Sequence, residues 1–594
     1  MRIIHTTRPG NRPSVDRRDI VGLTCALVLA FVSACAPAAS QPTRTGEGAG
    51  AAATTAPAAP KVLTVAVNSE PTTIEGFTGS NITRGSGFIL GIVHASLSAQ
   101  DDHGVYQPQL AAERIAADAG TWRLNPDGTM DVTWKLRPNI QWHDGTPFTS
   151  ADMAFTFKVK KDPAYPSIDS GALALMESVT APDPQTFVVH WSKPFFQADQ
   201  SRGLDPLPEH ILGDLYARGD SDGFVNNTYF TNGFVGLGPY RLTQWLQGSE
   251  MDFARFDAFY LGRPQLDQIN VRFIGDANAM VSAILAGAVD VVYPPGVDFD
   301  TAVNVRDRWQ GTSNVVRFDP SDPEGRMRVL EVQYRQDYAQ PKGALSNPTV
   351  RQALYTAIDR NTFVEVITHG LATVADSWIP PFSAKRSALE SSIPQYPYDP
   401  ARAQQLLAQA GWRPGSDGIL VNDQTGQRFD LTMRASQIGG GQVGKDKELA
   451  VVADSWKRIG VEPTLDLKAI GTTGDRGYEG VNPGMSNVGN MAPYATFFPR
   501  MSSRAIATEG NRWTGSNLSG FSDPVVDGLL DRFNVTVDAS QQLDIERQLL
   551  QKLMGEVSFM PLYWEVLPVL ISNGVDSTLV SPLHIREIYQ WNKK

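Results

Sequence analysis

The sequence predicts an α/β protein of two or three domains. Short segments rich in β-branched residues alternate along the chain with segments whose apolar residues recur at helical spacing. With 594 residues, 42% of them hydrophobic, the chain is long enough to bury several cores. The formal net charge of −11, without a basic stretch interleaved with aromatic residues, argues against a nucleic-acid-binding protein.

Residues 1–34 are predicted to be a signal peptide. Arginines precede an apolar run from Ile20 to Ala34, which is too short to span a bilayer of roughly 30 Å but is typical of a signal-peptide core. The run ends in Val32-Ser33-Ala34-Cys35, a lipobox, so we expect Cys35 to become the first residue and to be acylated. An ordinary signal peptide with an incidental cysteine is the alternative, and Arg17-Arg18 leaves a twin-arginine signal open.

The stretch from 35 to 60 is predicted to be a flexible tether. It consists of Ala, Pro, Thr and Gly with almost no large apolar residue, a composition that cannot offset the entropy of ordering. The chain has two cysteines, and Cys25 lies in the segment to be cleaved, so no disulfide is expected and the Cys35 thiol is available for lipid.

The globular part begins with a predicted strand over 62–67, and its most informative stretch runs from Met130 to Phe157. Period-two alternation predicts a half-buried strand with Met130, Val132, Trp134 and Leu136 on one face. Asp144-Gly145 predicts a turn with positive φ. Thr149 and Asp152 form a capping-box pattern for a helix expected to carry Met153, Ala154 and Phe157 inward.

Further helices are predicted from capping residues that precede apolar stripes. Asp276 is a candidate N-cap for a stripe of Met280, Val281, Ile284, Leu285 and Ala288. Asn347-Pro348 and Asp399-Pro400 each combine an N-cap with proline at the first helical position. Gly411 fits the end of the second of these helices.

Several of these segments resemble the family 5 extracellular solute-binding proteins, the oligopeptide-, dipeptide- and nickel-type receptors of ABC importers. The clearest matches are W-x-L-R-P-x-x-x-W-x-D-G-x-P-F-T-x-x-D over Trp134–Asp152, Y-D-P-x-x-A-x-x-L-L-x-x-A-G-W over Tyr398–Trp412, and NLSGFSDPVVDGLL over Asn517–Leu530. Gly236–Tyr240 departs from the family pattern, because Leu237 replaces the usual Thr. The resemblance runs from about Val62 to the end of the chain.

The resemblance implies a two-lobe periplasmic-binding-protein-like fold, class II and of the large peptide-receptor type. We expect a first lobe over 61–315 that contains an inserted subdomain, a second lobe over 316–544, and a return to the first lobe over 545–594. The implied protein is a monomeric, lipid-anchored solute-binding protein on the extracytoplasmic face of the cell membrane. It would enclose a peptide-like or other medium-sized solute between the lobes and deliver it to ABC permease subunits.

Candidate ligand-binding residues follow from the same resemblance. Sites of this kind are concave and apolar with a few placed polar groups. We expect contributions from Glu70 and Thr72 in the first lobe and from Trp378, Tyr494, Phe497 and Trp513 in the second. Tryptophan and tyrosine also fill cores, so each residue has a structural alternative.

One segment bears on the kind of ligand. Peptide receptors of this family hold the α-ammonium of the peptide with an Asp of the second lobe, and the segment that best occupies that place is Asn487–Phe498, NVGNMAPYATFF. It contains no carboxylate, and a buried ammonium without a counter-charge is costly. We therefore expect free-amine peptides to bind poorly, whereas Tyr494 and Phe497 would suit an apolar, stacked or sugar-like face.

Other chemistry finds little support in the sequence. Gly439–Lys445 has the spacing of a phosphate-binding loop, but Asp446 stands where Ser or Thr must hold Mg²⁺. The eight histidines form no zinc pattern, although one could face the cleft and meet a metal chelate, and no nucleophile motif occurs. We expect no catalytic residues, metal or cofactor. The alternatives left open are a receptor that feeds a sensor or acts as a chaperone and, least favoured, an exported hydrolase.

Overall fold

The computed structural model describes residues 59–594 except 76–85, 102, 117–118, 166–169, 201–202, 321, 437–443 and 469–475. The predicted signal peptide, Cys35 and all but the last two residues of the tether lie outside the described residues. Within the described ranges, no helix has both the length and the apolar character needed to cross a membrane.

A seven-stranded sheet is built around β1 (Val62–Val67), the strand predicted at the start of the globular part. β1 runs parallel to both of its neighbours, whereas the outer pairs are antiparallel. The strand order is β12 (Val315–Pro320), β21 (Val566–Ile571), β11 (Val291–Val292), β1, β10 (Gln268–Phe273), β9 (Glu250–Arg255) and β8 (Tyr240–Leu246).

Both faces of this sheet are covered, which explains the nearly continuous apolar sequence of β1. Leu63 and Val65 pack on one face in a cluster that includes residues of α1 (Ser86–Val93). Ala66 points to the other face and packs with apolar residues of α6 (Ala277–Leu285) and α7 (Phe299–Arg308). The short helical segment η7 (Pro582–Gln590) closes this part of the core.

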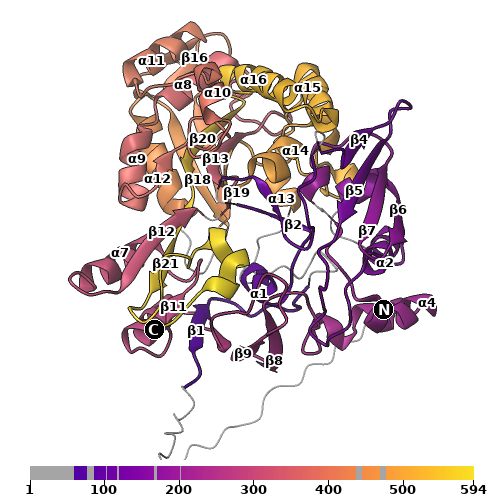
Figure 1. Ribbon diagram of the computed structural model, residues 1–594. Helices are drawn as coiled ribbons and strands as arrows, with labels where there is room; N and C mark the ends of the chain where they lie inside the picture. Colours follow the sequence, from indigo (N-terminus) through magenta and orange to yellow (C-terminus); the bar gives the residue numbers. More distant parts are fainter. Residues whose placement is uncertain are drawn as a thin grey trace, which may run out of the picture. The chain divides into compact units, whose positions relative to one another are not determined.

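A six-stranded sheet forms the second centre of the fold (Figure 1). Its order is β14 (Thr373–Val374), β20 (Phe559–Trp564), β13 (Met327–Val332), β19 (Met485–Met491), β17 (Asp430–Ser436) and β18 (Glu462–Lys468). β17 is parallel to both β18 and β19, and the remaining pairs are antiparallel. Met327–Val332 is buried throughout, as expected for a strand at the centre of a covered sheet.

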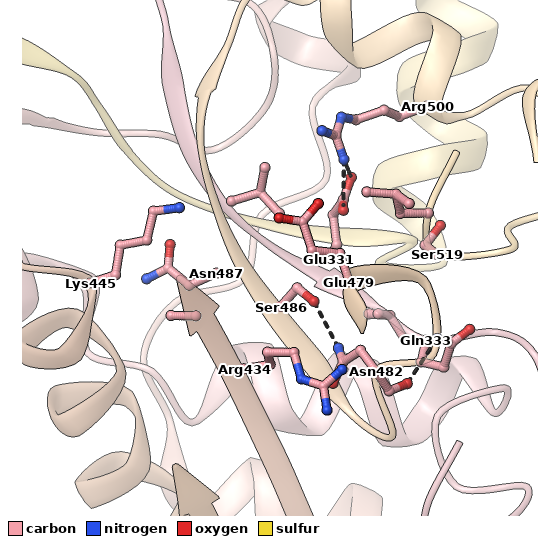
Figure 2. Close-up of a pocket in the computed structure, with 14 residues that line it drawn as sticks. Glu331, Gln333, Arg434, Lys445, Glu479, Asn482, Ser486, Asn487, Arg500 and Ser519 are labelled. Atoms are coloured by element: carbon pink, nitrogen blue, oxygen red, sulfur yellow. Dashed lines mark hydrogen bonds and ion pairs between the residues drawn. The ribbon is translucent and has the colours of Figure 1, made fainter. Parts of the chain in front are cut away.

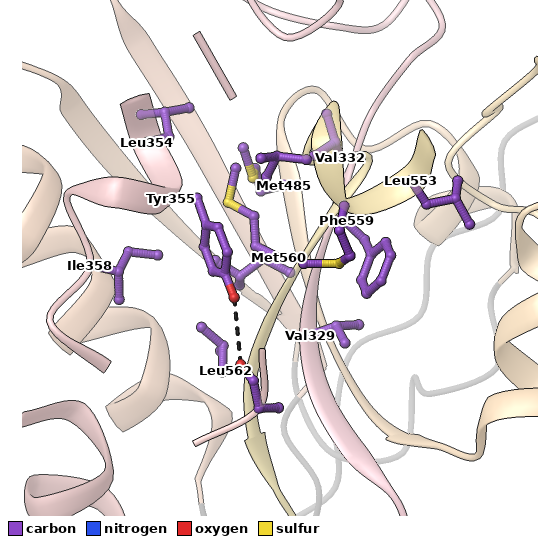
Figure 3. Close-up of a cluster of buried hydrophobic side chains, with 14 of the residues drawn as sticks. Val329, Val332, Leu354, Tyr355, Ile358, Met485, Leu553, Phe559, Met560 and Leu562 are labelled. Carbon is purple, nitrogen blue, oxygen red and sulfur yellow. Dashed lines mark hydrogen bonds between the residues drawn. The ribbon is translucent and has the colours of Figure 1, made fainter. Parts of the chain in front are cut away.

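Helices enclose this sheet and supply the largest apolar cluster of the described chain. Figure 3 shows Leu354, Tyr355 and Ile358 packed on the side of the sheet that carries Met560, whereas Val329 lies on the opposite side with Phe559. The hydroxyl of Tyr355 also donates a hydrogen bond to the main-chain carbonyl of Pro561, at 2.9 Å. The helices around this core are α8 (Pro348–Thr356), α9 (Arg360–Thr368), α10 (Arg386–Leu389), α11 (Pro400–Gln409), α12 (Lys445–Lys457), α13 (Arg476–Gly480), α14 (Phe498–Arg500), α15 (Pro524–Val535) and α16 (Ala539–Gly555).

The chain passes twice between the two large sheets. The first passage lies between Pro320 and Met327, and the second consists of Glu565 between β20 and β21. The passages touch, because the amide of Glu565 donates to the carbonyl of Arg326 at 2.6 Å. The lobe boundaries remain predictions. We expected the chain to return to the first lobe at residue 545, but α16 and β20 still pack in the core of the six-stranded sheet. The chain reaches the seven-stranded sheet again only at β21.

A four-stranded sheet, β4 (Trp122–Leu124), β5 (Met130–Lys135), β7 (Thr186–Trp191) and β6 (Met176–Asp183), carries the strand predicted at 130–136. Residues of β5 are alternately buried and half-buried, except for the exposed residue at its end. Gly145 has a φ of 89°. Thr149 and Asp152 form a capping box at the start of α2 (Ser150–Lys161). These three predictions are confirmed. Of the residues expected to point inward from α2, Met153 is buried and Ala154 and Phe157 are half-buried, and Phe157 packs against the same cluster as Met153. Phe155, which was not predicted to point inward, is buried in a second cluster.

The remaining elements are short. They are the pair β2 (Ser98–Gln100) and β3 (Tyr106–Pro108), the pair β15 (Trp412–Pro414) and β16 (Leu420–Asn422), the helices α3 (Ser170–Leu175), α4 (Glu209–Ala217) and α5 (Ser221–Val225), and the single turns η1 (Ala198–Gln200), η2 (Thr228–Phe230), η3 (Glu390–Ser392), η4 (Pro493–Phe497), η5 (Ser503–Ala505) and η6 (Glu509–Asn511). Asp276, Asn347 and Asp399 cap their helices as predicted. Leu285 and Ala288, predicted to lie in the core, are instead exposed, Leu285 by 42%, because the buried side of α6 is the one that carries Met280 and Ile284.

Candidate functional site

Two cavities of the described chain border each other, and residues from distant segments form their walls. The first, which we call the Trp378 pocket, has a volume of about 390 Å³. One wall consists of the turn between β2 and β3 (103–106) together with η1. The opposite wall consists of residues 378–385, Tyr494 and the start of α16. Its volume lies in the range of pockets that enclose small molecules.

A buried carboxylate organises the second wall of the Trp378 pocket. Glu546 is fully buried, and its Oε1 accepts hydrogen bonds from the indole of Trp378 at 3.2 Å and from the hydroxyl of Tyr494 at 2.8 Å. Lys385 Nζ lies 3.3 Å from Oε2 of Glu546 and donates to the Tyr494 hydroxyl at 2.9 Å. Burial, followed by the charge of Glu546, raises the pKa of Tyr494 well above its ordinary value, so the hydroxyl keeps its proton and donates it to Glu546.

The adjoining cavity, which we call the phenylalanine pocket, has a volume of about 410 Å³. Its walls come from α3, the segment 193–197, α14 and α15. Phe196 and Tyr494 line both pockets, with ring centres 6.1 Å apart in an edge-to-face arrangement. The two walls are also joined through the backbone, because the amide of Phe196 donates to the carbonyl of Asn534 at 3.0 Å.

A third, smaller cavity of about 110 Å³ lies in the six-stranded sheet, and we call it the crevice pocket (Figure 2). The parallel strands β17 and β19 pair only at 433–434 with 485–486, and residues 434–435 and 486–488 line the opening between them. Ligands of open α/β sheets commonly bind in such crevices at the carboxyl ends of strands. Arg500 Nη1 lies 3.0 Å from both carboxylate oxygens of Glu331, and Asn482 donates to Ser486 at 2.8 Å.

Two of the six predicted ligand residues, Trp378 and Tyr494, lie together in the Trp378 pocket. Phe497 is fully buried between Trp378 and Phe559, with ring centres 5.4 and 4.3 Å away, and lines none of these three cavities. Its position therefore favours the structural alternative. Trp513 is half-buried beside Arg335, whose guanidinium carbon lies 5.6 Å from the ring centre.

The two first-lobe candidates lie elsewhere. Oε1 of Glu70 accepts a bond from Trp245 at 2.6 Å, and Oε2 accepts one from the amide of Gly248 at 2.8 Å. Glu70 therefore ties the segment after β1 to the hairpin of β8 and β9. Thr72 is exposed, and neither residue lines any of these three cavities.

Lys385, which lines the Trp378 pocket, and Glu546, which bonds to two of its residues, do not appear among the sequence predictions. A signal for Glu546 was present, because it interrupts a stripe of apolar residues at helical spacing formed by Leu543, Leu550 and Leu553. An acidic residue on the buried face of a helix requires partners, and such a residue marks either a structural network or a site.

Neither a metal nor a phosphate site emerges from the described residues. Within them, no group of three or more His, Cys, Asp or Glu side chains is placed to hold a metal ion. Most of the glycine-rich stretch before Lys445 lies outside the described residues, and Gly444, which is described, is the N-cap of α12.

Curated relatives align with large parts of the chain. The oligopeptide-binding protein AppA of Bacillus subtilis is 28% identical over 341 residues, which cover 57% of this chain and 58% of AppA. Protein XP55 of Streptomyces lividans is 24% identical over 505 residues, 84% of this chain and 82% of that protein. Heme-binding protein A of Haemophilus influenzae is 26% identical over 314 residues, 50% of this chain and 54% of that protein. The chain thus spans little more than half the length of AppA.

Solved structures confirm the fold. The oligopeptide-binding protein of Thermus thermophilus, complexed with a pentapeptide, matches with a TM-score of 0.68 and 20% identity over 90% of this chain and 96% of the other. NikA of Brucella suis, in complex with Fe(III)-EDTA, matches with a TM-score of 0.71 and 19% identity over 90% and 100%. The predicted α/β fold of the two-lobe periplasmic-binding-protein type is therefore confirmed.

The family profile matches the middle of the chain. Residues 106–501 match the family model described as "Bacterial extracellular solute-binding proteins, family 5 Middle". The matched range contains the four-stranded sheet and part of both large sheets. It also contains the residues of the Trp378 pocket from Tyr106 to Tyr494. The resemblance seen in the sequence is confirmed, and the chain belongs to family 5 of the bacterial extracellular solute-binding proteins.

Proposed function

We propose that this protein is the extracytoplasmic solute-binding component of an ABC importer. It captures a peptide-like or other medium-sized solute in a cleft between two lobes and delivers it to the permease. Cys35 carries the lipid that anchors the protein to the outer face of the cell membrane, and the protein acts as a monomer without catalysing a reaction. The observation that carries the proposal is the Trp378 pocket, together with family membership.

The pocket fits this function because its two walls belong to different parts of the fold. The turn at 103–106 and η1 precede the six-stranded sheet in the chain, whereas 378–385, Tyr494 and α16 pack with that sheet. A solute that contacts both walls binds the closed arrangement more tightly than an open one, so binding shifts the population toward closure. The permease can then recognise the loaded protein by its shape.

Native mass spectrometry and small-angle scattering together test the proposal. Purified protein is expected to retain a solute of unchanged mass, and stripping it by unfolding and refolding should increase the radius of gyration. Adding the solute back should restore the smaller value. A radius of gyration that does not change at saturation, or chemical conversion of the solute, would contradict the proposal.

A substitution in the pocket supplies the matched control. Tyr494→Phe removes the hydroxyl that joins Lys385 to Glu546, and we expect it to weaken solute binding by about five- to tenfold, the effect of one hydrogen bond. Tyr398→Phe alters a tyrosine that is 41% exposed and lines none of the three cavities described above, so its affinity should equal that of the wild type.

A further inference from the structure

The phenylalanine pocket contains a polar group whose hydrogen-bonding capacity the protein leaves unused. Gln197 lines this pocket, and its side chain is 5% exposed. Its Nε2 atom is buried and has no hydrogen-bond partner among the described residues. An amide donor that is buried without an acceptor costs free energy, and most such groups in folded proteins are paired. An acceptor from outside the chain would satisfy this donor.

The surroundings of Gln197 restrict what can bring that acceptor. The pocket is walled mainly by apolar side chains: Leu175, Phe195, Phe196, Phe498, Leu530 and Val535. Its charged residues are Lys193, which is exposed, and Arg504 and Asp531, which pair with each other while both remain more than half exposed. Among the described residues, no buried charge lines the pocket, so an ionic group in its interior would lose water without gaining a buried partner of opposite charge.

We infer that the phenylalanine pocket binds a neutral part of the solute, an aromatic or branched alkyl group next to a carbonyl, and that Gln197 donates a hydrogen bond to the carbonyl oxygen. This inference rests on the proposed solute-binding function and specifies its ligand class. Aromatic rings prefer edge-to-face or offset packing, and Phe195 and Phe196 already adopt it with ring centres 5.7 Å apart. An amide or ester that carries such a group meets both requirements.

The position of the pocket explains how such a group would be part of a larger solute. Phe196 and Tyr494 line both this cavity and the Trp378 pocket. The Trp378 pocket adds charged and polar side chains, so it suits the polar part of the same molecule. They include Asp199, Gln200, Glu324, Lys385 and Gln542. The predicted solute is therefore amphipathic, with its apolar acyl or aromatic end in the phenylalanine pocket.

Two probes of nearly identical shape test the carbonyl requirement. In 4-phenylbutan-2-one two methylene groups join a phenyl ring to a carbonyl, and in isopentylbenzene a methyl branch replaces the carbonyl oxygen. Ligand-observed NMR titrations of stripped protein should give about fivefold tighter binding of the ketone, as expected for one hydrogen bond. Gln197→Met keeps the side-chain length but removes the donor, so it should abolish this preference while still binding the hydrocarbon.

Thermal stability separates a ligand-binding role from a structural one. Because the Gln197 amide is unpaired without solute, the stripped Gln197→Met protein should melt at the same temperature as the wild type or higher. Gln548→Met, a substitution of an exposed glutamine on α16 away from the cavities, is the control and should retain the ketone preference.

The inference falls if neither probe binds the wild type, if Gln197→Met keeps the preference for the ketone, or if that variant melts lower with the preference unchanged. Probe binding is measured directly, so the result does not depend on lobe closure. Absence of closure with any solute would overturn the proposed function, whereas closure without a carbonyl preference would overturn this inference alone.

Discussion

Arg328 and Glu448 form an ion pair that is removed from solvent. Arg328 Nε lies 3.1 Å from Glu448 Oε1, and the two side chains are 2% and 0% exposed. Tyr563 donates to Oε1 of Glu448 and Asn487 to Oε2, both at 2.6 Å. This network fixes one helix to three strands of the six-stranded sheet. Glu448 belongs to α12, and its three partners belong to the strands: Arg328 to β13, Tyr563 to β20 and Asn487 to β19.

Breaking this pair should be costly. In Glu448→Gln the buried guanidinium of Arg328 keeps Glu565 as an acidic partner, but at the longer distance of 4.0 Å. We therefore expect the free energy of unfolding to fall by about 3–5 kcal/mol. Urea denaturation measures the loss. Lys447→Gln is the control, because Lys447 pairs with Asp300 at 2.9 Å while both remain more than half exposed, and its loss should stay below about 1 kcal/mol. Equal losses in the two variants would contradict the expectation.

Acid should destabilise the protein through His143. Its Nδ1 accepts from the amide of Gly236 at 3.1 Å and its Nε2 donates to the carbonyl of Gly238 at 3.0 Å, which fixes the neutral ring. Burial lowers the pKa of His143 from 6.5 to about 4, so the unfolded chain takes up a proton first and stability falls as the pH drops from 6.5 toward 4.

The matched variant is His143→Asn, which keeps an acceptor for the Gly236 amide but does not titrate. Between pH 7 and pH 5 the wild type should lose about 2 kcal/mol more stability than this variant. Denaturation curves at both pH values provide the measurement. Parallel pH dependence of the two proteins would show that His143 is not responsible.

Glu75 should act in the opposite direction. Burial raises the pKa of Glu75 from 4.5 to about 7 and outweighs the opposing charge of Lys160, whose Nζ lies 3.7 Å from Oε1. The folded protein therefore holds a proton that the unfolded chain has released between pH 4.5 and 7, and this contribution to stability is lost as the pH rises through that window.

Glu75→Gln removes this titration. Relative to the variant, the wild type should become less stable by up to about 3 kcal/mol between pH 4.5 and pH 8. Glu390→Gln, at a side chain that is 66% exposed, should leave the pH profile unchanged. A constant difference between wild type and Glu75→Gln across this range would be incompatible with a buried, protonated Glu75.

Free-amine peptides should bind more weakly than their N-acetylated forms. Asn487–Phe498 contains no carboxylate, and Glu546, which reaches Tyr494 from α16, already accepts bonds from Trp378, Tyr494 and Lys385. The segment itself therefore offers an α-ammonium group no counter-charge, although the carboxylates of Asp199 and Glu324 also line the Trp378 pocket. Calorimetry with matched free and acetylated di- to pentapeptides is the measurement, and micromolar or tighter binding that disappears on acetylation would refute the expectation.

The anchor is tested by Cys35→Ala. Because Cys35 is the candidate for acylation, the variant should be released in soluble form or remain as uncleaved precursor. Fractionation followed by intact mass measurement distinguishes these forms from the lipidated protein. A variant that stays on the membrane with the mass of the processed protein would show that another feature holds it there.

Local sequence signals were sufficient for much of the fold. The strand at Met130, the turn at Gly145 and the capping box of Thr149 depend on neighbouring residues, and the structure contains all three. Met153 and Phe157 of α2 pack in the core of the subdomain as predicted, but nothing in the local sequence indicated that Phe155 is buried in a second cluster. Periodicity identifies a helix but not the neighbours that it meets.

The site was less predictable because its walls come together from distant segments. Trp378 and Tyr494 were identified from their residue type and family position, yet the carboxylate that joins them belongs to Glu546 on α16. Gln197 carries no local signal at all, since its importance follows from burial without a hydrogen-bond partner among the described residues. Such relationships exist only after the chain has folded.

The place of β21 has a consequence for how the protein is made. This strand follows β12 and β11 at a long distance in the sequence, yet it lies between them in the interior of the seven-stranded sheet. Until it emerges, two strands that precede it by more than 200 residues lack their common neighbour and expose unpaired edges. The seven-stranded sheet therefore cannot be completed until β21 has been synthesised, so the strands made earlier must wait for a partner that is distant in sequence.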